Sequence, residues 1–244
     1  DVERSRGLGD VYKRQIYKLS LYNITIETLW GGMTLMKLRK TIVVAAASTL
    51  LLAGCTTDKK EVKAYDDNVQ KAFDKEQSIN EVSKKLNSLE EKKQGLYKKA
   101  NSNDSNTRSK AADDVLDNID KREKTFDKEV SILKNSEKQF KKGDSHINDI
   151  KNDNKRKEVK QLDDAIKNKY KTHDDYAKAY RNVLSKEKDL FELVKQDGVT
   201  QSQVDEKNNA LNKAQENFKK KFQAYAKAMN TVNKEKQDVD HLIS

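Results

Sequence analysis

The chain has 244 residues, of which 50 are basic and 40 acidic, and its formal net charge is +10. It contains a single cysteine, which excludes a disulfide framework and a thiolate metal cluster. Charges of both signs are mixed along the chain, a pattern typical of solvated helix faces rather than of a nucleic-acid-binding stripe. We therefore expect no nucleic-acid partner.

Residues 1–35 are expected not to be native protein. The segment from Val2 to Gln15 resembles a translated sequencing adapter, and the following residues up to Leu35 show no helical or strand period. A signal peptide normally begins a chain, and one follows directly, so we place the start at Met36. Met33 is a second candidate start, and a genuine N-terminal extension is the alternative.

Residues 36–54 have the order of a secretory signal peptide: cationic residues, an apolar run, then small residues at a cut site. The apolar run from Thr41 to Ala53 is too short for a permanent membrane span, which needs about 20 residues. The closing residues Leu52-Ala53-Gly54-Cys55 resemble the lipobox of bacterial lipoproteins. That resemblance implies cleavage between Gly54 and Cys55 and a diacylglyceryl cysteine, carrying fatty acids such as palmitate, at Cys55. The protein is then lipid-anchored on the extracellular face of the bacterial cell membrane.

Processing at this site would change the charge of the protein. Residues 1–54 hold eight basic and four acidic side chains, so their loss lowers the net charge from +10 to +6. Proline is absent from the whole chain and glycine is rare after residue 54. Because both residues break helices, very long helices are allowed.

Residues 55–61 are expected to form a lipidated polar tether, and residues 62–244 a helical domain. The first helix should run from Val62 to about Ala100, with one apolar stripe at steps of three and four. The polar run 101–107 (NSNDSNT) is the clearest loop, and Asn106 or Thr107 is the expected cap of a second helix. That helix should end near Lys142.

The region 141–156 leaves two readings open. Gly143 could end a helix, or the helix could continue through it. A third apolar stripe follows from Val159 to Val194 and stops at Gly198, and Thr200 with Gln203 fits a capping box for a fourth helix. The expected fold is all-α, an elongated antiparallel bundle of four long helices, or three if Gly143 does not break the chain.

Side chains that could perform catalysis are scattered. The histidines are His146, His173 and His241, and a metal site needs several ligands at fixed separations. The sequence contains no nucleophile elbow, phosphate loop or zinc-protease motif. We therefore expect no enzyme activity, no cofactor and no metal.

Basic clusters are the candidate contacts with a polyanion. They are Lys219, Lys220 and Lys221, and the group around Lys155-Arg156-Lys157 with Lys160. Anionic cell-wall polymers attract such clusters, although Lys219 to Lys221 also fit a solvated helix face between core residues. Tyr176 falls off the main stripe of the third helix, so it is the expected exposed aromatic for a partner contact.

The lipobox, followed by about 190 residues of proline-free long helices, resembles the YkyA-like family of cell-wall-binding lipoproteins of Gram-positive bacteria. The motifs KLRKTIVVAAASTLLLAGC and KAYDDNVQKAFDKE carry the resemblance, which covers about residues 36–244. It implies a membrane-anchored surface protein that contacts an anionic cell-wall polymer or peptidoglycan. The alternatives are a helical adaptor that binds an unknown protein partner, or host molecule, and a cell-wall-modifying enzyme.

Overall fold

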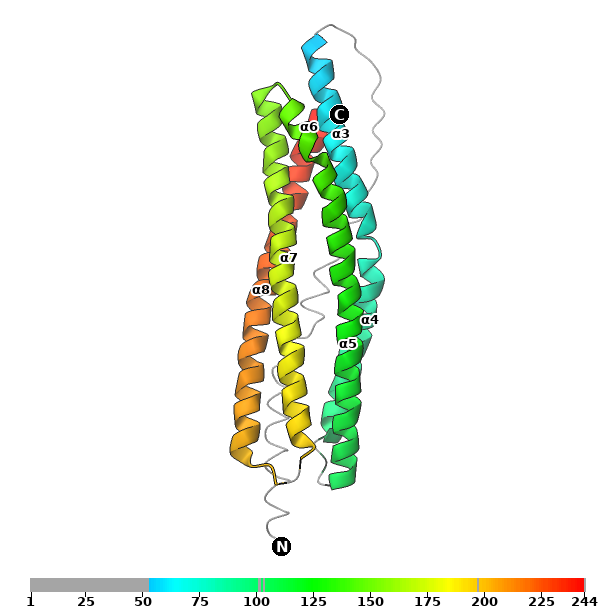
Figure 1. Ribbon diagram of the computed structural model, residues 1–244, viewed down its shortest axis with the longest axis vertical. Coiled ribbons are helices and arrows are strands. Elements are labelled where there is room, and N and C mark those ends of the chain that lie inside the picture. Colours follow the sequence, from blue (N-terminus) through cyan, green and yellow to red (C-terminus); the bar gives the residue numbers. More distant parts are fainter. Residues whose placement is uncertain (1–52, 101, 103, 197, 244) are drawn as a thin grey trace. The chain divides into compact units, whose positions relative to one another are not determined.

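The computed structural model describes residues 53–243 except 101, 103 and 197, with side chains described from Thr57 onward. The described chain is all-α and has no strands, and four long helical segments pack antiparallel. In chain order the elements are α3 (Ala53–Lys75), α4 (Ile79–Ala100), α5 (Ser105–Phe140), η1 (Lys141–Gly143), α6 (Asp144–Asp149), α7 (Asp153–Val194) and α8 (Gln201–Ile243) (Figure 1). The predicted fold class is confirmed. The predicted signal peptide lies almost entirely outside the described residues, and so do residues 1–35.

Helix α3 begins earlier than the apolar stripe does. The segment 55–61, expected to be a tether, forms the first turns of α3 instead. Asp58 explains why these turns are held: its Oδ1 accepts the Lys151 N–H at 2.7 Å and its Oδ2 accepts the Asn152 N–H at 3.0 Å. Asp58, a polar residue of the expected tether, is thus buried and bonded to the backbone before α7.

The first predicted helix is two helices. α3 ends at Lys75, and a turn at residues 76–78 separates it from α4. The backbone closes this turn with the Glu76 N–H on the Phe73 carbonyl and the Ile79 N–H on the Glu76 carbonyl, both at 2.9 Å. The apolar stripe continues across the turn, which is why spacing alone did not indicate it.

Gly143 does not break the chain, yet the bundle still has four long segments. Gly143 is helical (φ −82°, ψ −17°) and lies in the short 3-10 turn η1. The chain reverses direction later, where Ile150 becomes extended with ψ 117°. A Cβ on Gly143 would approach the Tyr65 ring at 3.2 Å and Asn68 Cβ at 3.3 Å, so close packing against α3 accounts for the glycine.

The ends of the other helices follow capping chemistry. Asp104, rather than Asn106 or Thr107, caps α5, since its Oδ2 accepts the Thr107 N–H at 2.6 Å. The predicted capping box of α8 is present: the Thr200 N–H donates to Gln203 Oε1 at 2.8 Å, and the Gln203 N–H donates to Thr200 Oγ1 at 3.4 Å. Gly198 has φ +74°, a conformation that glycine adopts without steric cost.

The described chain divides into two compact units, to which α5, α7 and α8 each contribute residues. The first unit comprises residues 80–130 and 174–223, and the second comprises residues 53–79, 131–173 and 224–243. In the second unit, apolar side chains from α3, α5, α6, α7 and α8 form one core cluster that includes Tyr65, Phe140, Ile150, Leu162 and Val239.

The core of the first unit is rich in aromatic rings. Tyr176 is 1% exposed, and its ring lies 5.6 Å from Phe126, 5.5 Å from Phe218 and 5.7 Å from Phe222. The prediction that Tyr176 is an exposed aromatic is therefore wrong. It lies off the stripe of its own helix, but rings from α5 and α8 enclose it.

Candidate functional site

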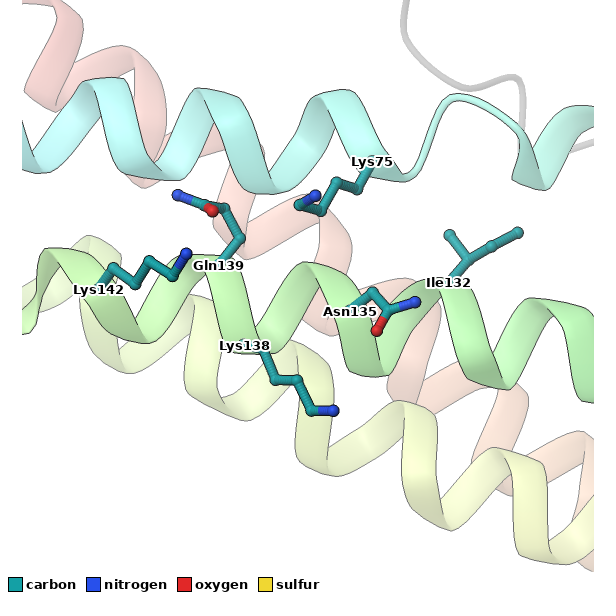
Figure 2. Close-up of a pocket in the computed structure, with 6 residues that line it drawn as sticks. All are labelled: Lys75, Ile132, Asn135, Lys138, Gln139 and Lys142. Carbon is teal, nitrogen blue, oxygen red and sulfur yellow. The ribbon is translucent and has the colours of Figure 1, made fainter.

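An open groove of about 410 Å³ lies between the end of α3 and α5 in the second unit. Its lining residues are Lys75, Ile132, Asn135, Lys138, Gln139 and Lys142 (Figure 2). Residues 132, 135, 139 and 142 follow steps of three, four and three, which places them on one helix face. Apart from Ile132 that face is polar, whereas the neighbouring stripe through Leu133 and Phe140 is buried in the core.

The turn after α3 opens this groove. In Figure 2 the helical ribbon of α3 stops just after Lys75, and Ile132 of α5 lies opposite the turn that follows. Gln139 projects into the space between the two helices, and its Nε2 donates to Asn68 Oδ1 at 3.1 Å. The interruption at residues 76–78 thus leaves part of the α5 face uncovered.

The three groove lysines are exposed, and none of them forms an ion pair within the described part of the chain. The carboxylates that adjoin them in sequence are engaged elsewhere. Glu137 pairs with Lys141 at 2.6 Å, and Asp74 accepts hydrogen bonds from two glutamine amides. The groove lysines therefore have no carboxylate partner among the described residues, and their positive charges attract anions.

Glu76, next to Lys75, turns inward instead of toward the groove. Its carboxylate accepts hydrogen bonds from Lys169 Nζ at 2.6 Å and from Ser136 Oγ at 2.5 Å. Ser136 Oγ also lies 2.8 Å from the Tyr170 hydroxyl. Burial, followed by the charge of Glu76, raises the pKa of Tyr170 well above its usual value. This buried network holds the turn and removes a carboxylate from the groove.

A second buried network lies in the first unit around Arg122, which is completely buried. Its guanidinium contacts Glu90 at 2.9 Å and Glu187 at 2.6 Å, and its Nε donates to Asn118 Oδ1 at 2.9 Å. Although burial opposes the charged form, Lys93 and Arg122 hold the pKa of Glu90 below its usual value. The Tyr97 and Tyr180 hydroxyls donate to these two carboxylates, and burial raises the pKa of both phenols.

This network resembles a catalytic cluster only in composition. Each carboxylate is paired with a fixed cation, and every member comes from a helix packed in the core. The arrangement holds α4, α5 and α7 together through hydrogen-bonded charge pairs.

The predicted basic contacts fall on solvated faces. Lys219 and Lys220 are exposed on α8, and Lys221 pairs with Asp175 at 3.0 Å. In the cluster around Lys155, Arg156 donates to the Ile150 carbonyl at 2.9 Å and pairs with Asp153. Tyr176 packs against Phe218 and Phe222, which flank Lys219 to Lys221, but its ring is buried and forms no exposed surface with these lysines.

The histidines are not grouped into a ligand set within the described chain. His146 Nδ1 lies 2.8 Å from Glu61 Oε2, and the buried His173 ring lies 5.2 Å from the Tyr225 ring. The described acidic groups that come close enough to share a cation are Glu158, Glu235 and Asp238. Lys234 already contacts two of them, at 3.1 and 3.9 Å.

Sequence reasoning missed the groove lysines. For Lys138 and Lys142, the signal that could have revealed them is their helical spacing with the polar residues Asn135 and Gln139, beside the apolar stripe of α5. Cys55 lies in the first turn of α3, but its side chain is outside the described residues, so its lipidation stays a prediction. No helix in the described part of the chain has the length and apolar character that a membrane crossing needs.

Comparisons with known proteins agree with the fold. A crystal structure at 1.6 Å of a conserved protein of unknown function from Staphylococcus aureus is 46% identical, with a TM-score of 0.73. The match covers 79% of this chain and 98% of that one. No curated protein matched the chain. The family model of YkyA, described as "Putative cell-wall binding lipoprotein", matches residues 60–242. The chain therefore belongs to the YkyA family.

Proposed function

We propose that this protein is a non-enzymatic lipoprotein, anchored through Cys55 on the extracellular face of the cell membrane, that binds an anionic polymer of the cell wall. Membership of the YkyA family supports surface anchoring and wall binding. The observation that carries the choice of an anionic polymer is the set of exposed lysines without carboxylate partners in the described chain. They include Lys219 and Lys220 on α8 and the three groove lysines, Lys75, Lys138 and Lys142.

Peptidoglycan glycan strands are a less suitable ligand for this surface. Proteins commonly hold sugar rings and partner surfaces against exposed aromatic side chains. Among the described residues every tyrosine is buried, and so is every phenylalanine except the half-buried Phe73. The same observation counts against a helical adaptor that docks a partner through aromatic anchors.

Retention on isolated cell walls tests the proposal. The full chain, purified in a nonionic detergent, should be retained at low salt on walls that keep their anionic polymer. Retention should fall when the polymer is extracted, and also at high salt, because ions screen exposed charges. Replacing Lys219 and Lys220 by glutamine should weaken retention modestly.

Two results would contradict the proposal. One is no retention of the wild-type chain on intact walls at low salt. The other is equal retention before and after extraction of the anionic polymer, which would assign binding to peptidoglycan instead.

A further inference from the structure

We infer that the groove between the end of α3 and α5 is a binding site for the phosphodiester groups of an anionic polymer. This inference rests on the proposed function, because it names the ligand chemistry and the residues of one wall-binding site. Its evidence is the geometry of the groove itself, which is lined by three cations, two carboxamides and one apolar side chain from α3, α5 and η1.

The charges of the groove favour a multiply charged or repeating anion. Lys75 comes from α3, while Lys138 and Lys142 come from α5 and η1. The lysines thus come from different chain segments, and in Figure 2 Lys138 extends away from Lys75 along the other side of α5. Lysine binds phosphate as a point charge, without the paired geometry that arginine imposes. Three separated ammonium groups therefore suit successive phosphates along a flexible chain.

The carboxamides add hydrogen-bond donors beside these charges. Asn135 is exposed, and Gln139 is half-buried with one of its two N–H groups facing Asn68. An amide N–H₂ carries two donors, so Gln139 keeps a second one for a ligand. Ile132 offers an apolar contact for the carbon atoms that link phosphates in a polymer. These features together distinguish the groove from a lysine-rich patch such as Lys219 and Lys220.

The position of the groove along α3 favours a polymer over a lipid headgroup. Lys75 follows Cys55 by twenty residues in one uninterrupted helix, which corresponds to about 30 Å along the helix axis. A protein anchored at Cys55 can thus hold this groove well outside the headgroup layer. The groove is also open rather than enclosed, so a long chain can pass through it (Figure 2).

Titration with defined probes tests the inference. The full chain in nonionic detergent is titrated with a glycerol phosphate oligomer, inorganic phosphate, polyglutamate and phosphatidylglycerol vesicles. We expect the oligomer to bind most tightly and to shift the side-chain amide signals of Asn135 and Gln139 in nitrogen–proton correlation spectra. The triple variant Lys75→Gln, Lys138→Gln, Lys142→Gln should bind the oligomer about tenfold more weakly and with a shallower salt dependence, since phosphate contacts dominate such binding.

A matched control separates the groove from general attraction. Lys110, Lys124 and Lys128 are exposed on the part of α5 that belongs to the first unit and have no ion-pair partner in the described chain. Their replacement by glutamine removes the same charge and should weaken oligomer binding less than threefold. Circular dichroism checks that both triple variants are folded.

Several outcomes would overturn the inference. Equal losses in the two triple variants would show general electrostatic attraction. Equal affinity for polyglutamate would remove the preference for phosphate, and binding to vesicles alone would assign a headgroup. Wall retention that is unchanged in the groove variant would refute the groove and leave the proposed function standing. Oligomer binding at the groove without wall retention would refute the proposed function and leave the groove standing.

Discussion

At the scale of single residues, Arg122 is the side chain whose loss should cost most. Its guanidinium satisfies two buried carboxylates, Glu90 and Glu187, and the Asn118 side-chain oxygen. A buried ion pair adds little stability to the fold compared with well-packed apolar residues in place of both partners. Removing one partner is different, because the remaining charge stays buried without compensation.

Arg122→Met should therefore lower the free energy of unfolding by about 3–5 kcal/mol, measured by urea denaturation at pH 7. Lowering the pH should reduce this loss, because a protonated carboxyl group costs less to bury than a carboxylate. The matched control is Arg181→Met, which removes an exposed pair with Asp127 at 2.6 Å and should cost about 0–1 kcal/mol. Equal losses in the two variants would show that the buried network contributes no more to stability than an exposed ion pair.

At the scale of secondary-structure elements, the turn between α6 and α7 depends on a side chain from α3. The Asp58 carboxylate accepts the N–H groups of Lys151 and Asn152, which leave the helical pattern at this turn. The hydrogen bond from the Lys151 N–H is the main cause that lowers the pKa of Asp58 below its usual value near 3.8. The charged form therefore stabilises the fold.

Asp58→Asn should lower the urea midpoint at pH 7, because an amide can accept only one of these two hydrogen bonds. A carboxyl group whose pKa is lowered by folding stabilises the native state above its unfolded pKa, and loses that effect as the pH falls through the folded value. The difference between wild type and variant should thus be full at neutral pH and shrink below about pH 4. Midpoints measured across this range check the sign.

Asp149→Asn is the control for this prediction, since Asp149 is exposed at the end of α6. It should change the midpoint little at any pH. A difference between wild type and Asp58→Asn that grows as the pH falls would contradict the assigned role of Asp58.

At the scale of the whole molecule, the two units share three helices but have different polar interiors. The first unit is held by the Arg122 network, and the second by the Glu76–Lys169 pair with Ser136 and Tyr170. The groove belongs to the second unit, which also contains α3 and thus the backbone of Cys55. The proposed anchor Cys55 and one residue of the proposed groove, Lys75, therefore lie on the same helix.

Cys55→Ala tests the anchor in cells. The variant should lack the mass of a diacylglyceryl group and should no longer be processed by the lipoprotein pathway, because no thiol remains to form the thioether. Mass spectrometry of the membrane fraction measures both effects, and Thr56→Ala serves as the neighbouring control. Normal lipid attachment to the Cys55→Ala variant would refute the proposed anchor.

Much of the fold could be predicted because helix formation is local. Apolar side chains at steps of three and four indicated each long helical segment, and Gly198 with the Thr200–Gln203 capping box marked the boundary before α8. Asn208 and Lys236 continue the spacing of the apolar residues of α8, and both are buried. These features depend on neighbours within a few turns of the same helix.

The candidate site could not be predicted in the same way. The lysines around the groove come from α3, α5 and η1. Whether they are free to bind an anion depends on which nearby carboxylates pair with side chains of other helices instead. Glu76 would have counted as a partner for Lys75 on sequence alone, yet it is turned inward to Lys169. The exposed lysines Lys219 and Lys220 were found from the sequence because a run of like charges is visible without tertiary contacts.

By itself, therefore, the sequence determined the all-α class, the ends of α4 and α7, the start of α8 and the resemblance to wall-binding lipoproteins, since these follow from local periodicity and short motifs. Only the tertiary structure decided that Tyr176 is core, that Ile150 rather than Gly143 marks the reversal, and that a groove opens beside Lys75. The physical reason is that burial and charge compensation depend on residues from other helices, which helical spacing within one segment does not specify.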